Sequence, residues 1–438
     1  MNSEKLAFSP YALYKDSGVE WLGQVPEHWE VKRVKDIVSV KRGASPRPID
    51  DPIYFDDDGE FSWVRIADLS ASERYLLTTK EKLSKLGASR SVKRYPNDFI
   101  LSIAGTVGKP IITKIKCCIH DGFVWFPNLK INPEYWYYCF STGLPYQGLG
   151  KLGTQLNLNT ETVGLISLPL PPKNETAQII DYLDQKTAQI DHEIDLLSKK
   201  TTLYSNLKQS LINETVTRGL DKNAALKDSG VEWLGQVPEH WQIKRLKDIG
   251  TSIIGIIYSP EDVVDNDSQG VLVLRSSNIQ KGKLSLLDVV YVNQKIRPRQ
   301  TIRMGDILIC SRNGSRDLIG KNICIDESIS GCTFGAFMTV YRSRYFEFIS
   351  KFFNSQIFKA QSGLFMSSTI NQLTINTLNN FLIPLPPLPE QKAIANYLDQ
   401  KTLQIDNMVS AIDRKIATLQ ELRKTLINDV VTGQIKVI

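Results

Sequence analysis

The chain has 438 residues, of which 42% are hydrophobic and 23% are charged. This length is too great for one compact domain and sufficient for two to four, and the composition is that of an ordinary soluble globular protein. The formal net charge of +6 allows a polyanionic partner but does not require one.

Neither a membrane span nor a secretory signal is predicted. The longest apolar run, Ile253–Tyr258, is far shorter than the about 20 residues that cross a bilayer, and the N-terminal residues contain no apolar core. We therefore expect a cytoplasmic protein. The six cysteines form no C-x-x-C pair and, with the four histidines, no zinc-ligand spacing, so we expect reduced thiols and no metal site.

The first recognisable segment, KDSGVEWLGQVPEHW at Lys15–Trp29, recurs unchanged at Lys227–Trp241. Three further pairs of segments match in the same order, 215 residues apart. They are Leu168–Pro172 with Ile383–Pro387, Tyr182–Thr187 with Tyr397–Thr402, and Leu211–Asn213 with Leu426–Asn428. The whole chain is therefore a tandem duplication, and the regions between the matched segments have diverged.

The diverged regions are predicted to be mixed α/β structure. Phe61–Leu69 and Val271–Ile279 have the pattern of strands that enter loops. Asn97–Lys114 and Met304–Ile325 share the order turn, apolar strand, Gly-rich polar loop, Lys and strand. The segment WYYCF that follows Tyr135 is predicted to be a packed helix.

Weak motifs in the first half do not indicate catalysis. GLGKLG at Gly148–Gly153 fits G-x-G-x-x-G but neither follows a buried strand nor opens a helix, so a flexible loop is the simpler interpretation. AGTVGKP at Ala104–Pro110 is too short for a P-loop, and Pro110 stands where Ser or Thr would bind magnesium. We find no catalytic triad and no complete methylase motif.

Basic residues around the Gly-rich loops are candidates for DNA contacts. Exposed loop amides with Arg or Lys can hold phosphates, and arginine forks can recognise guanine edges. Solvated surface charge is the alternative for any single residue. The candidates are Lys41, Arg42, Arg47, Arg65 and Lys109 in the first half, and Arg275, Arg297, Arg299, Arg303, Arg312, Arg316 and Lys321 in the second.

Two long helices follow the proline-rich stops at Pro172 and Pro387. Apolar residues recur every seven positions, and Gly219 and Gly433 are predicted to end the helices. The predicted coiled-coil seam is Leu183, Ile190, Leu197, Tyr204 and Leu211, with Leu398, Ile405, Ile412, Leu419 and Leu426. Two amphipathic helices that each pack on their own domain are the alternative.

The order of segments along the chain predicts how the helices pair. The first helix would be about 60 Å long and would end just before the second copy of the repeat at Lys227. The second helix must run back to pair with the first. We therefore expect an antiparallel coiled coil with a globular domain at each end and internal pseudo-two-fold symmetry.

When these segments are taken together, the chain closely resembles the DNA-specificity subunit of Type I restriction–modification systems. The resemblance covers nearly the whole chain and rests on the duplicated V-E-W-L-G-Q-V-P-E-H-W, P-L-P-P, Y-L-D-Q-K-T and L-I-N segments. It implies an α/β fold with two target-recognition domains joined by two helices. The expected limits are 1–167 for the first recognition domain, 168–220 for the first helix, 221–382 for the second domain and 383–438 for the second helix.

The resemblance also implies a function without catalysis. Each domain would recognise one half of a split site in double-stranded DNA, and the helices would set the gap and dock two adenine methyltransferase (modification) subunits. S-adenosylmethionine, ATP and magnesium are expected on partner subunits and no cofactor on this chain. Restriction subunits with translocase and nuclease activity would join such a complex.

The two halves do not carry the same candidate DNA contacts. The basic loop at Lys41–Pro48 has as its counterpart Ile253–Val263, which keeps the Ser-Pro pair but not the basic residues. DNA contacts at that loop therefore do not carry over to the second half.

A duplicated coiled-coil adaptor with two ligand-binding domains that do not bind DNA is the alternative function, and it predicts no salt-dependent DNA affinity.

Overall fold

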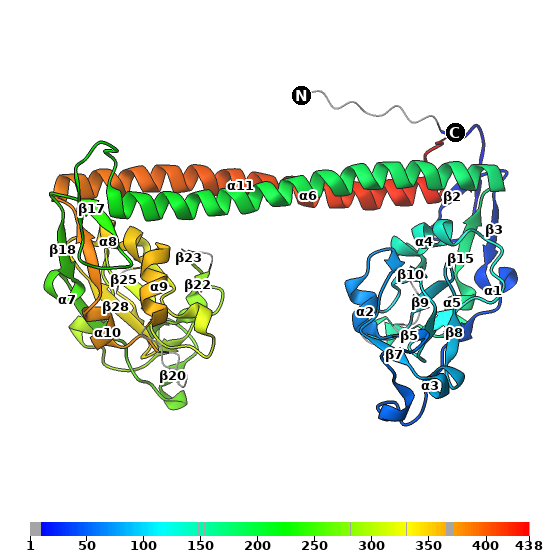
Figure 1. The fold of residues 1–438 in the computed structure, drawn as a ribbon, viewed down its shortest axis with the longest axis horizontal. Coiled ribbons are helices and arrows are strands. Elements are labelled where there is room, and N and C mark those ends of the chain that lie inside the picture. Colours follow the sequence, from blue (N-terminus) through cyan, green and yellow to red (C-terminus); the bar gives the residue numbers. More distant parts are fainter. Residues whose placement is uncertain are drawn as a thin grey trace. The chain divides into compact units, whose positions relative to one another are not determined.

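The computed structural model of the protein describes residues 10–147, 149, 151–152, 155–156, 158–280, 282–329, 331–364 and 372–437. Its contacts form two compact units (Figure 1). Unit 1 comprises residues 1–197 and 414–438, and unit 2 comprises residues 198–413. Both boundaries fall inside the long helices, and the linear domain limits expected from the sequence stay a prediction.

Unit 1 contains two main sheets, with strand orders β4-β12-β9-β10-β6 and β7-β5-β11-β8. The strands of the first sheet are β4 (Lys41–Arg42), β12 (Phe123–Trp125), β9 (Phe99–Ser102), β10 (Pro110–Thr113) and β6 (Tyr75–Leu76). Those of the second are β7 (Glu81–Leu83), β5 (Phe61–Val64), β11 (Cys117–Ile119) and β8 (Val92–Arg94). The short helices are α1 (Val34–Ile37), α2 (Ile66–Ala71), α3 (Lys85–Ser89), α4 (Pro133–Ser141) and α5 (Thr160–Leu165).

Unit 2 repeats this plan with sheets β19-β28-β25-β26 and β20-β24-β21-β27. The first sheet contains β19 (Thr251–Ile254), β28 (Met338–Arg342), β25 (Ile307–Cys310) and β26 (Asn322–Cys324). The second contains β20 (Val263–Val264), β24 (Tyr291–Val292), β21 (Val271–Leu274) and β27 (Thr333–Phe334). Its short helices are α7 (Leu246–Ile249), α8 (Phe346–Phe353), α9 (Gln356–Leu364) and α10 (Ile375–Asn379).

The central strands β9 and β25 are apolar except for Ser102 at the end of β9, because both of their faces are covered. In β9, Phe99 and Leu101 face the cluster that includes α4, whereas Ile100 faces the core shared by the two sheets. In β25, Ile307 and Ile309 likewise belong to one cluster and Leu308 and Cys310 to another. The strands predicted in both diverged regions and the packed helix at WYYCF are confirmed, but β5 is followed by helix α2 and not by the expected loop.

The two long helices are α6 (Lys173–Arg218) and α11 (Leu388–Val431), and in each unit they pack antiparallel (Figure 1). In unit 1, Leu183 of α6 shares a core with Leu426 of α11. In unit 2, Ile212 of α6 shares a core with Leu398 of α11. All ten predicted seam residues are buried or half-buried. Among the described residues, no helix has the length and apolar character needed to span a membrane.

Glycines end both long helices, as predicted. Gly219 follows α6 with φ of 76°, and Gly433 lies two residues beyond α11 with φ of 75°. Glycine adopts this left-handed conformation with the least strain, because it has no Cβ.

The repeated segment forms the same junction in both units. Trp29 donates its ring N–H to Glu175, in the first turn of α6, at 2.8 Å, and His28 lies 2.7 Å from the same carboxylate. In unit 2, Trp241 donates to Glu390 of α11 at 3.1 Å. Both indole rings are fully buried. A carboxylate in the first turn also complements the helix dipole, so each junction stabilises a helix start.

Each junction also contacts the end of the other long helix. In unit 1, Tyr14 donates to the backbone oxygen of Gly433 at 3.0 Å, and Gln434 donates to the backbone oxygen of Gln24 at 2.6 Å. In unit 2, Gly219 lies against Trp241 at the junction. The fifteen-residue segment is therefore needed twice, because each copy holds one helix start and one helix end.

Candidate nucleic-acid interface

The lysines of the Gly-rich loops bind backbone oxygens. Lys109 donates from Nζ to the backbone oxygens of Ser70 (3.3 Å) and Ser72 (2.5 Å), and Lys321 Nζ lies 3.5 Å from that of Ser276. Burial lowers the pKa of Lys109. In both units the lysine therefore ties its loop to the segment that follows the strand β5 or β21.

The loop amides next to these lysines also have partners within the loops. The N–H of Gly108 donates to the oxygen of Ser102 at 2.9 Å, and the N–H of Lys109 donates to the Ser102 hydroxyl at 3.0 Å. In unit 2, the N–H of Gly320 donates to Cys310 at 2.9 Å. These three amides close hairpins and are not open to a phosphate.

Arg65 and Arg275 occupy equivalent positions directly after β5 and β21. Arg65 donates to Glu81 at 2.5 Å, and Arg275 lies 2.8 Å from Asp288. Both ion pairs are partly exposed to water, where such pairs contribute little stability. Nε and Nη2 of Arg275 are buried, so Arg65, whose side chain is 40% exposed, is the more accessible of the two arginines.

Three of the predicted cations in unit 1 lie around one loop, between β11 and β12. Arg42 donates to the backbone oxygen of Asp121 at 2.5 Å, and Arg47 lies 3.3 Å from its carboxylate. Lys41 lies over the Trp125 ring at 5.9 Å. Burial alone would raise the pKa of Asp121, but the hydrogen bond from Ser45 and the two arginines hold that pKa below its usual value.

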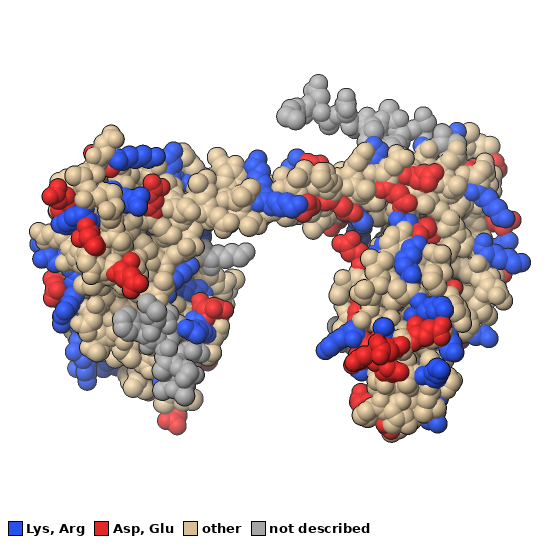
Figure 2. Space-filling model, viewed as in Figure 1, with Lys and Arg blue, Asp and Glu red and all other residues tan. Residues whose placement is uncertain are grey.

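The remaining predicted cations of unit 2 are exposed. They are Arg297, Arg299, Arg303, Arg312 and Arg316. Arg303 donates to the backbone oxygen of Pro298 at 3.4 Å, and the guanidinium of Arg312 lies 5.2 Å from the centre of the Phe337 ring. On the face drawn in Figure 2, Lys and Arg side chains lie among Asp and Glu side chains on both units.

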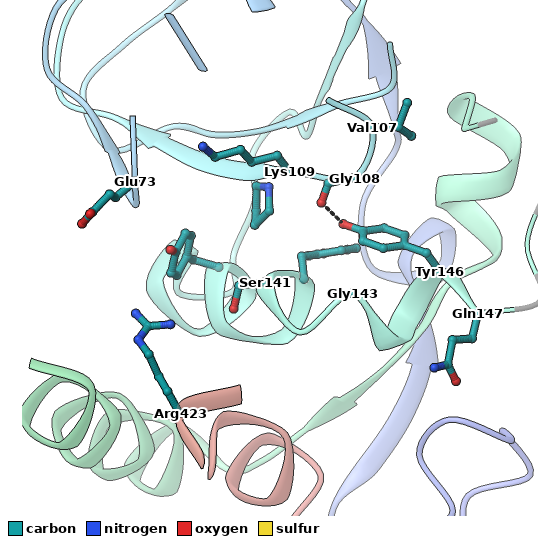
Figure 3. A pocket seen from close by; sticks show the side chains of 12 residues that line it. Glu73, Val107, Gly108, Lys109, Ser141, Gly143, Tyr146, Gln147 and Arg423 are labelled. Carbon is teal, nitrogen blue, oxygen red and sulfur yellow. Dashed lines mark hydrogen bonds between the residues drawn. The ribbon is translucent and has the colours of Figure 1, made fainter. Parts of the chain in front are cut away.

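A cavity of about 900 Å³ in unit 1 lies between the loop after β9, helix α4 and helix α11. Figure 3 shows Lys109 and Arg423 on opposite sides of it. Tyr146 donates to the backbone oxygen of Gly108 at 2.8 Å and closes one end (Figure 3). Of the GLGKLG motif, Gly148, Gly150 and Gly153 lie outside the described residues.

The cysteines are free thiols, and five of the six are buried. Burial raises the pKa of Cys117 to about 12 and of Cys118 to about 11, so both stay protonated. In the part of the chain that the structure describes, no three His, Cys, Asp or Glu side chains come together as a metal site. These cysteines act as core residues.

Comparison with known proteins identifies the family. The profile described as Type I restriction modification DNA specificity domain matches the chain twice, at residues 26–199 and 238–416. The chain belongs to this family. It is a DNA-specificity subunit of a Type I restriction–modification system, a DNA-recognition component and not a catalytic one.

Relatives of this specificity subunit support the assignment, one of them over nearly its full length. The Type I restriction enzyme MjaVIII specificity subunit of Methanocaldococcus jannaschii is 25% identical over 94% of both chains. The EcoKI specificity subunit of Escherichia coli strain K12 is 30% identical over 46% of this chain and 44% of its own length.

Solved structures share the fold of this specificity subunit. A chain from a study of complex assembly and conformational transition of the type I R-M system matches with a TM-score of 0.74. It is 18% identical, over 93% of this chain and 98% of its own length. The HsdS subunit from Thermoanaerobacter tengcongensis matches with a TM-score of 0.52 at 18% identity, over 94% of this chain and 98% of its own.

Sequence patterns missed several residues of the junctions and loops. Glu175 and Glu390 each lie three residues after the last proline of the P-L-P-P motif, and this shared spacing was a usable signal. Asp121 and Phe337 gave no such signal. They differ in type between the halves, and their partners come from distant segments.

Proposed function

We propose that each unit recognises one half of a bipartite DNA site. The observation that carries this proposal is the duplication itself. Two equivalent junctions, each with a buried Trp and a helix-terminal Glu, hold two frameworks whose loops carry different side chains. A protein that recognised one continuous sequence would need only one such framework.

The basic residues around the loops would supply the DNA contacts. Cations that neutralise phosphates give affinity, which falls with salt at a log–log slope of about 0.9 per phosphate, and base-edge contacts give specificity. The proposed DNA-binding residues are Lys41, Arg42, Arg47, Arg65, Lys109, Arg275, Arg297, Arg299, Arg303, Arg312, Arg316 and Lys321.

The long helices would set the number of base pairs between the two halves. Helices α6 and α11 contain 46 and 44 residues and continue without an internal break. A straight helix of this length rises about 65–70 Å. One turn of DNA is about 34 Å, so half-sites one to two turns apart suit helices of this length.

Two methyltransferase subunits would dock on the helix pair, one at each unit. In unit 2, Ser205 and Gln209 of α6 line a cavity whose other wall includes Lys283 and Lys351, so these two residues face the globular part of the unit. Leu207 lies two residues from Ser205 and two residues from Gln209, a rotation of about 200° around the helix, so it points away from that cavity. Leu207 is 54% exposed, and Leu203 is 67% exposed. Leu422, 215 residues after Leu207, is 52% exposed in unit 1. Equivalent exposed leucines suit two copies of one partner.

The chemistry would belong to the partners. S-adenosylmethionine would be held by the methyltransferase subunits, and ATP and magnesium by restriction subunits where these join. Extruding the target adenine costs a few kcal/mol, which protein on both sides of the base would offset.

The test of this function is the pattern of adenine methylation across the host genome, with and without the gene. We expect one split, asymmetric motif to lose its methylation when the gene is deleted. A continuous motif would contradict the bipartite proposal. Unchanged methylation, together with a purified complex that does not bind DNA in a salt-dependent way, would favour the adaptor function.

A further inference from the structure

Two loops of each unit meet at one edge, and the structure aligns them between the units. In unit 1 this edge, which we call the specificity edge, comprises Arg42–Arg47 and His120–Gly122; in unit 2 it comprises Ile254–Ser259 and Gly335–Phe337. Four equivalent hydrogen bonds define the alignment. They are Gly43 N to Phe123 O (2.9 Å) and Ala44 N to Ile119 O (3.1 Å), with Gly255 N to Met338 O (3.3 Å) and Ile256 N to Phe334 O (2.8 Å).

The alignment follows from the glycine at which the two loops of each unit cross. A Cβ on Gly43 would lie 2.2 Å from the backbone oxygen of His120, and one on Gly255 would lie 2.2 Å from that of Gly335. Only glycine allows this approach. Gly255 therefore corresponds to Gly43, and the Ser-Pro pair that the sequence aligned is displaced by two residues. By this register, Arg42, Ser45 and Gly122 correspond to Ile254, Ile257 and Phe337.

In unit 1 the specificity edge is polar. The Ser45 hydroxyl donates to the Asp121 carboxylate at 3.0 Å, and Arg42 and Arg47 surround the same residue. The two arginine side chains are 59% and 70% exposed, and the carboxylate is 40% exposed. Donors and an acceptor thus lie side by side with open access to a ligand.

In unit 2 the same edge presents three exposed apolar side chains, and Ser259 stands at the position of Arg47. Ile254, Ile257 and Phe337 are 51%, 81% and 59% exposed. The N–H of Arg312 donates to the backbone oxygen of Phe337 at 3.0 Å, and its guanidinium lies over the ring. An exposed ring beneath a guanidinium, on an edge that also carries two exposed isoleucines, suits a ligand with apolar groups next to anionic ones.

We infer that the specificity edge is the base-recognition surface of both units, and that the units use it with opposite chemistry. This inference rests on the proposed function. In unit 1, Arg42 or Arg47 donates to guanine and Asp121 accepts from the cytosine amino group of a G·C pair. In unit 2, Ile257 and Phe337 contact the methyl group of a thymine, while Arg312 lies against the phosphates.

The equivalence of the two edges excludes a purely structural role for the side chains that differ between them. The backbone scaffold is the same in both units, so the scaffold does not require any of these side chains. A purely structural edge would not replace three polar or small positions by three exposed apolar ones. A position that changes chemistry on a constant scaffold is what two different half-sites require.

Unit 2 is tested with the complex of this chain and its methyltransferase subunits, bound to duplexes that carry the methylated motif. Replacing each thymine of one half-site by deoxyuridine removes a single methyl group. We expect one such replacement to weaken wild-type binding about four-fold, as for one buried methyl group. The Ile257→Ala and Phe337→Ala complexes should not respond to that replacement.

Met304→Ala is the matched control for unit 2. Met304 is 57% exposed and lies just before the start of β25. The other end of β25, at Cys310, pairs with Met338, which follows Phe337, so Met304 and Phe337 lie at opposite ends of this strand. This variant should keep the wild-type response to deoxyuridine. A wild-type complex that is insensitive to every replacement, or an alanine variant that keeps the response, overturns the assignment of unit 2.

Unit 1 is tested by the methylated motif that the complex selects from a randomised DNA library. Asp121→Asn should relax the preference for one G·C pair about 10-fold or more, in one half-site only. Asp57→Asn, at an exposed carboxylate outside the edge, is the control and should leave the motif unchanged.

The outcomes separate the two levels of the proposal. If the wild-type complex selects no split motif, the proposed function fails and this inference fails with it. If the wild-type motif is split but the Asp121 variant keeps every base preference, only the assignment of the specificity edge in unit 1 is wrong. A change in both half-sites would contradict the separate roles of the two units.

Discussion

Gly433 shows how a single residue determines the junction in unit 1. Its φ is 75°, and an added Cβ would lie 2.3 Å from Pro26 and 3.2 Å from Trp29. We expect Gly433→Ala to destabilise unit 1 by about 3 kcal/mol, from backbone strain and overpacking together. The measurement is the unfolding midpoint in urea, followed by tryptophan fluorescence.

Gly18→Ala is the matched control for this prediction. Gly18 has a similar φ of 67°, but no atom lies within 4 Å of an added Cβ. Its replacement should cost only the backbone term, about 1–2 kcal/mol. Equal losses in the two variants would show that the contact with Pro26 contributes nothing.

His120 makes the stability of unit 1 depend on pH. Burial lowers the pKa of His120, and Arg65 and Arg42 add to this effect against the opposing charge of Asp121. The Gly122 N–H donates to its Nδ1 at 2.8 Å, which also requires the neutral ring. The unfolded chain binds this proton more readily, so stability is complete above about pH 6.5 and falls as the pH drops below that value.

The measurement is the urea midpoint between pH 7.5 and pH 5.0. His120→Asn, whose amide oxygen can accept from the Gly122 N–H, should show a smaller loss over this range. A variant with the wild-type pH dependence would exclude His120 as the cause.

Repeated residues on the long helices make equivalent ion pairs in the two units. Arg423 pairs with Asp191 at 2.8 Å in unit 1, and Lys208 pairs with Asp406 at 2.6 Å in unit 2. Each partner lies 215 residues from its equivalent. These exposed pairs add little stability, but they favour one antiparallel register in both units.

The Asp of the repeated Y-L-D-Q-K-T motif connects each long helix to the globular part of its unit. Asp184 accepts from Arg74 at 2.5 Å and from the hydroxyl of Tyr138 in unit 1. Asp399 accepts from Lys351 in unit 2. The aspartate on the helix is thus the same in both units, whereas its partners differ: Arg74 and Tyr138 in unit 1, and Lys351 in unit 2.

The exposed leucines of the helix pair lead to a prediction about stoichiometry. Leu207→Asp should reduce the number of bound methyltransferase subunits from two to one, and Leu207→Asp with Leu422→Asp should leave none. The reason is that a charge on an apolar contact must be desolvated on binding. Native mass spectrometry of the co-expressed complex gives the count.

Leu403→Asp serves as the control for docking. Leu403 is 61% exposed and lies three residues before Asp406, which lines the same unit 2 cavity as Ser205 and Gln209. This variant should keep two methyltransferase subunits. If the Leu207 and Leu422 variants also keep two, the partners dock elsewhere.

The helices were predictable from the sequence because their signals are local. A seven-residue period and a terminal glycine lie within one segment, and so do the apolar runs of β9 and β25. The grouping of Arg42, Arg47 and Asp121 was not predictable, since it depends on how two loops cross. The Gly-rich loops had the composition of a phosphate site, but Gly108 and Lys109 use their amides within the hairpin.

At the scale of the whole molecule, helix length should control the gap in the DNA site. Deleting one heptad from each helix, residues 194–200 and 411–417, keeps the seam in phase and shortens each helix by about 10 Å. We expect the gap to shrink by about three base pairs while both half-sites stay the same. The methylated motif of the variant complex provides the measurement.

Removing the heptad from α6 alone is the control. It places the seam residues of the two helices out of register and should abolish methylation instead of shifting the motif. The spacer role is wrong if the double deletion alters the half-sites and preserves the gap.

The contact of Tyr14 with Gly433 has a consequence for the order of the chain. The equivalent junction in unit 2 is crossed by a covalent connection, Leu220–Leu226, between the end of α6 and the start of the repeated segment. A linker of similar length after Gly433 could make the same connection in unit 1, and the chain could then be opened at Leu220–Leu226. Such a circular permutant would exchange which recognition unit is synthesised first without altering the fold, so the fold itself does not dictate which half comes first in the gene.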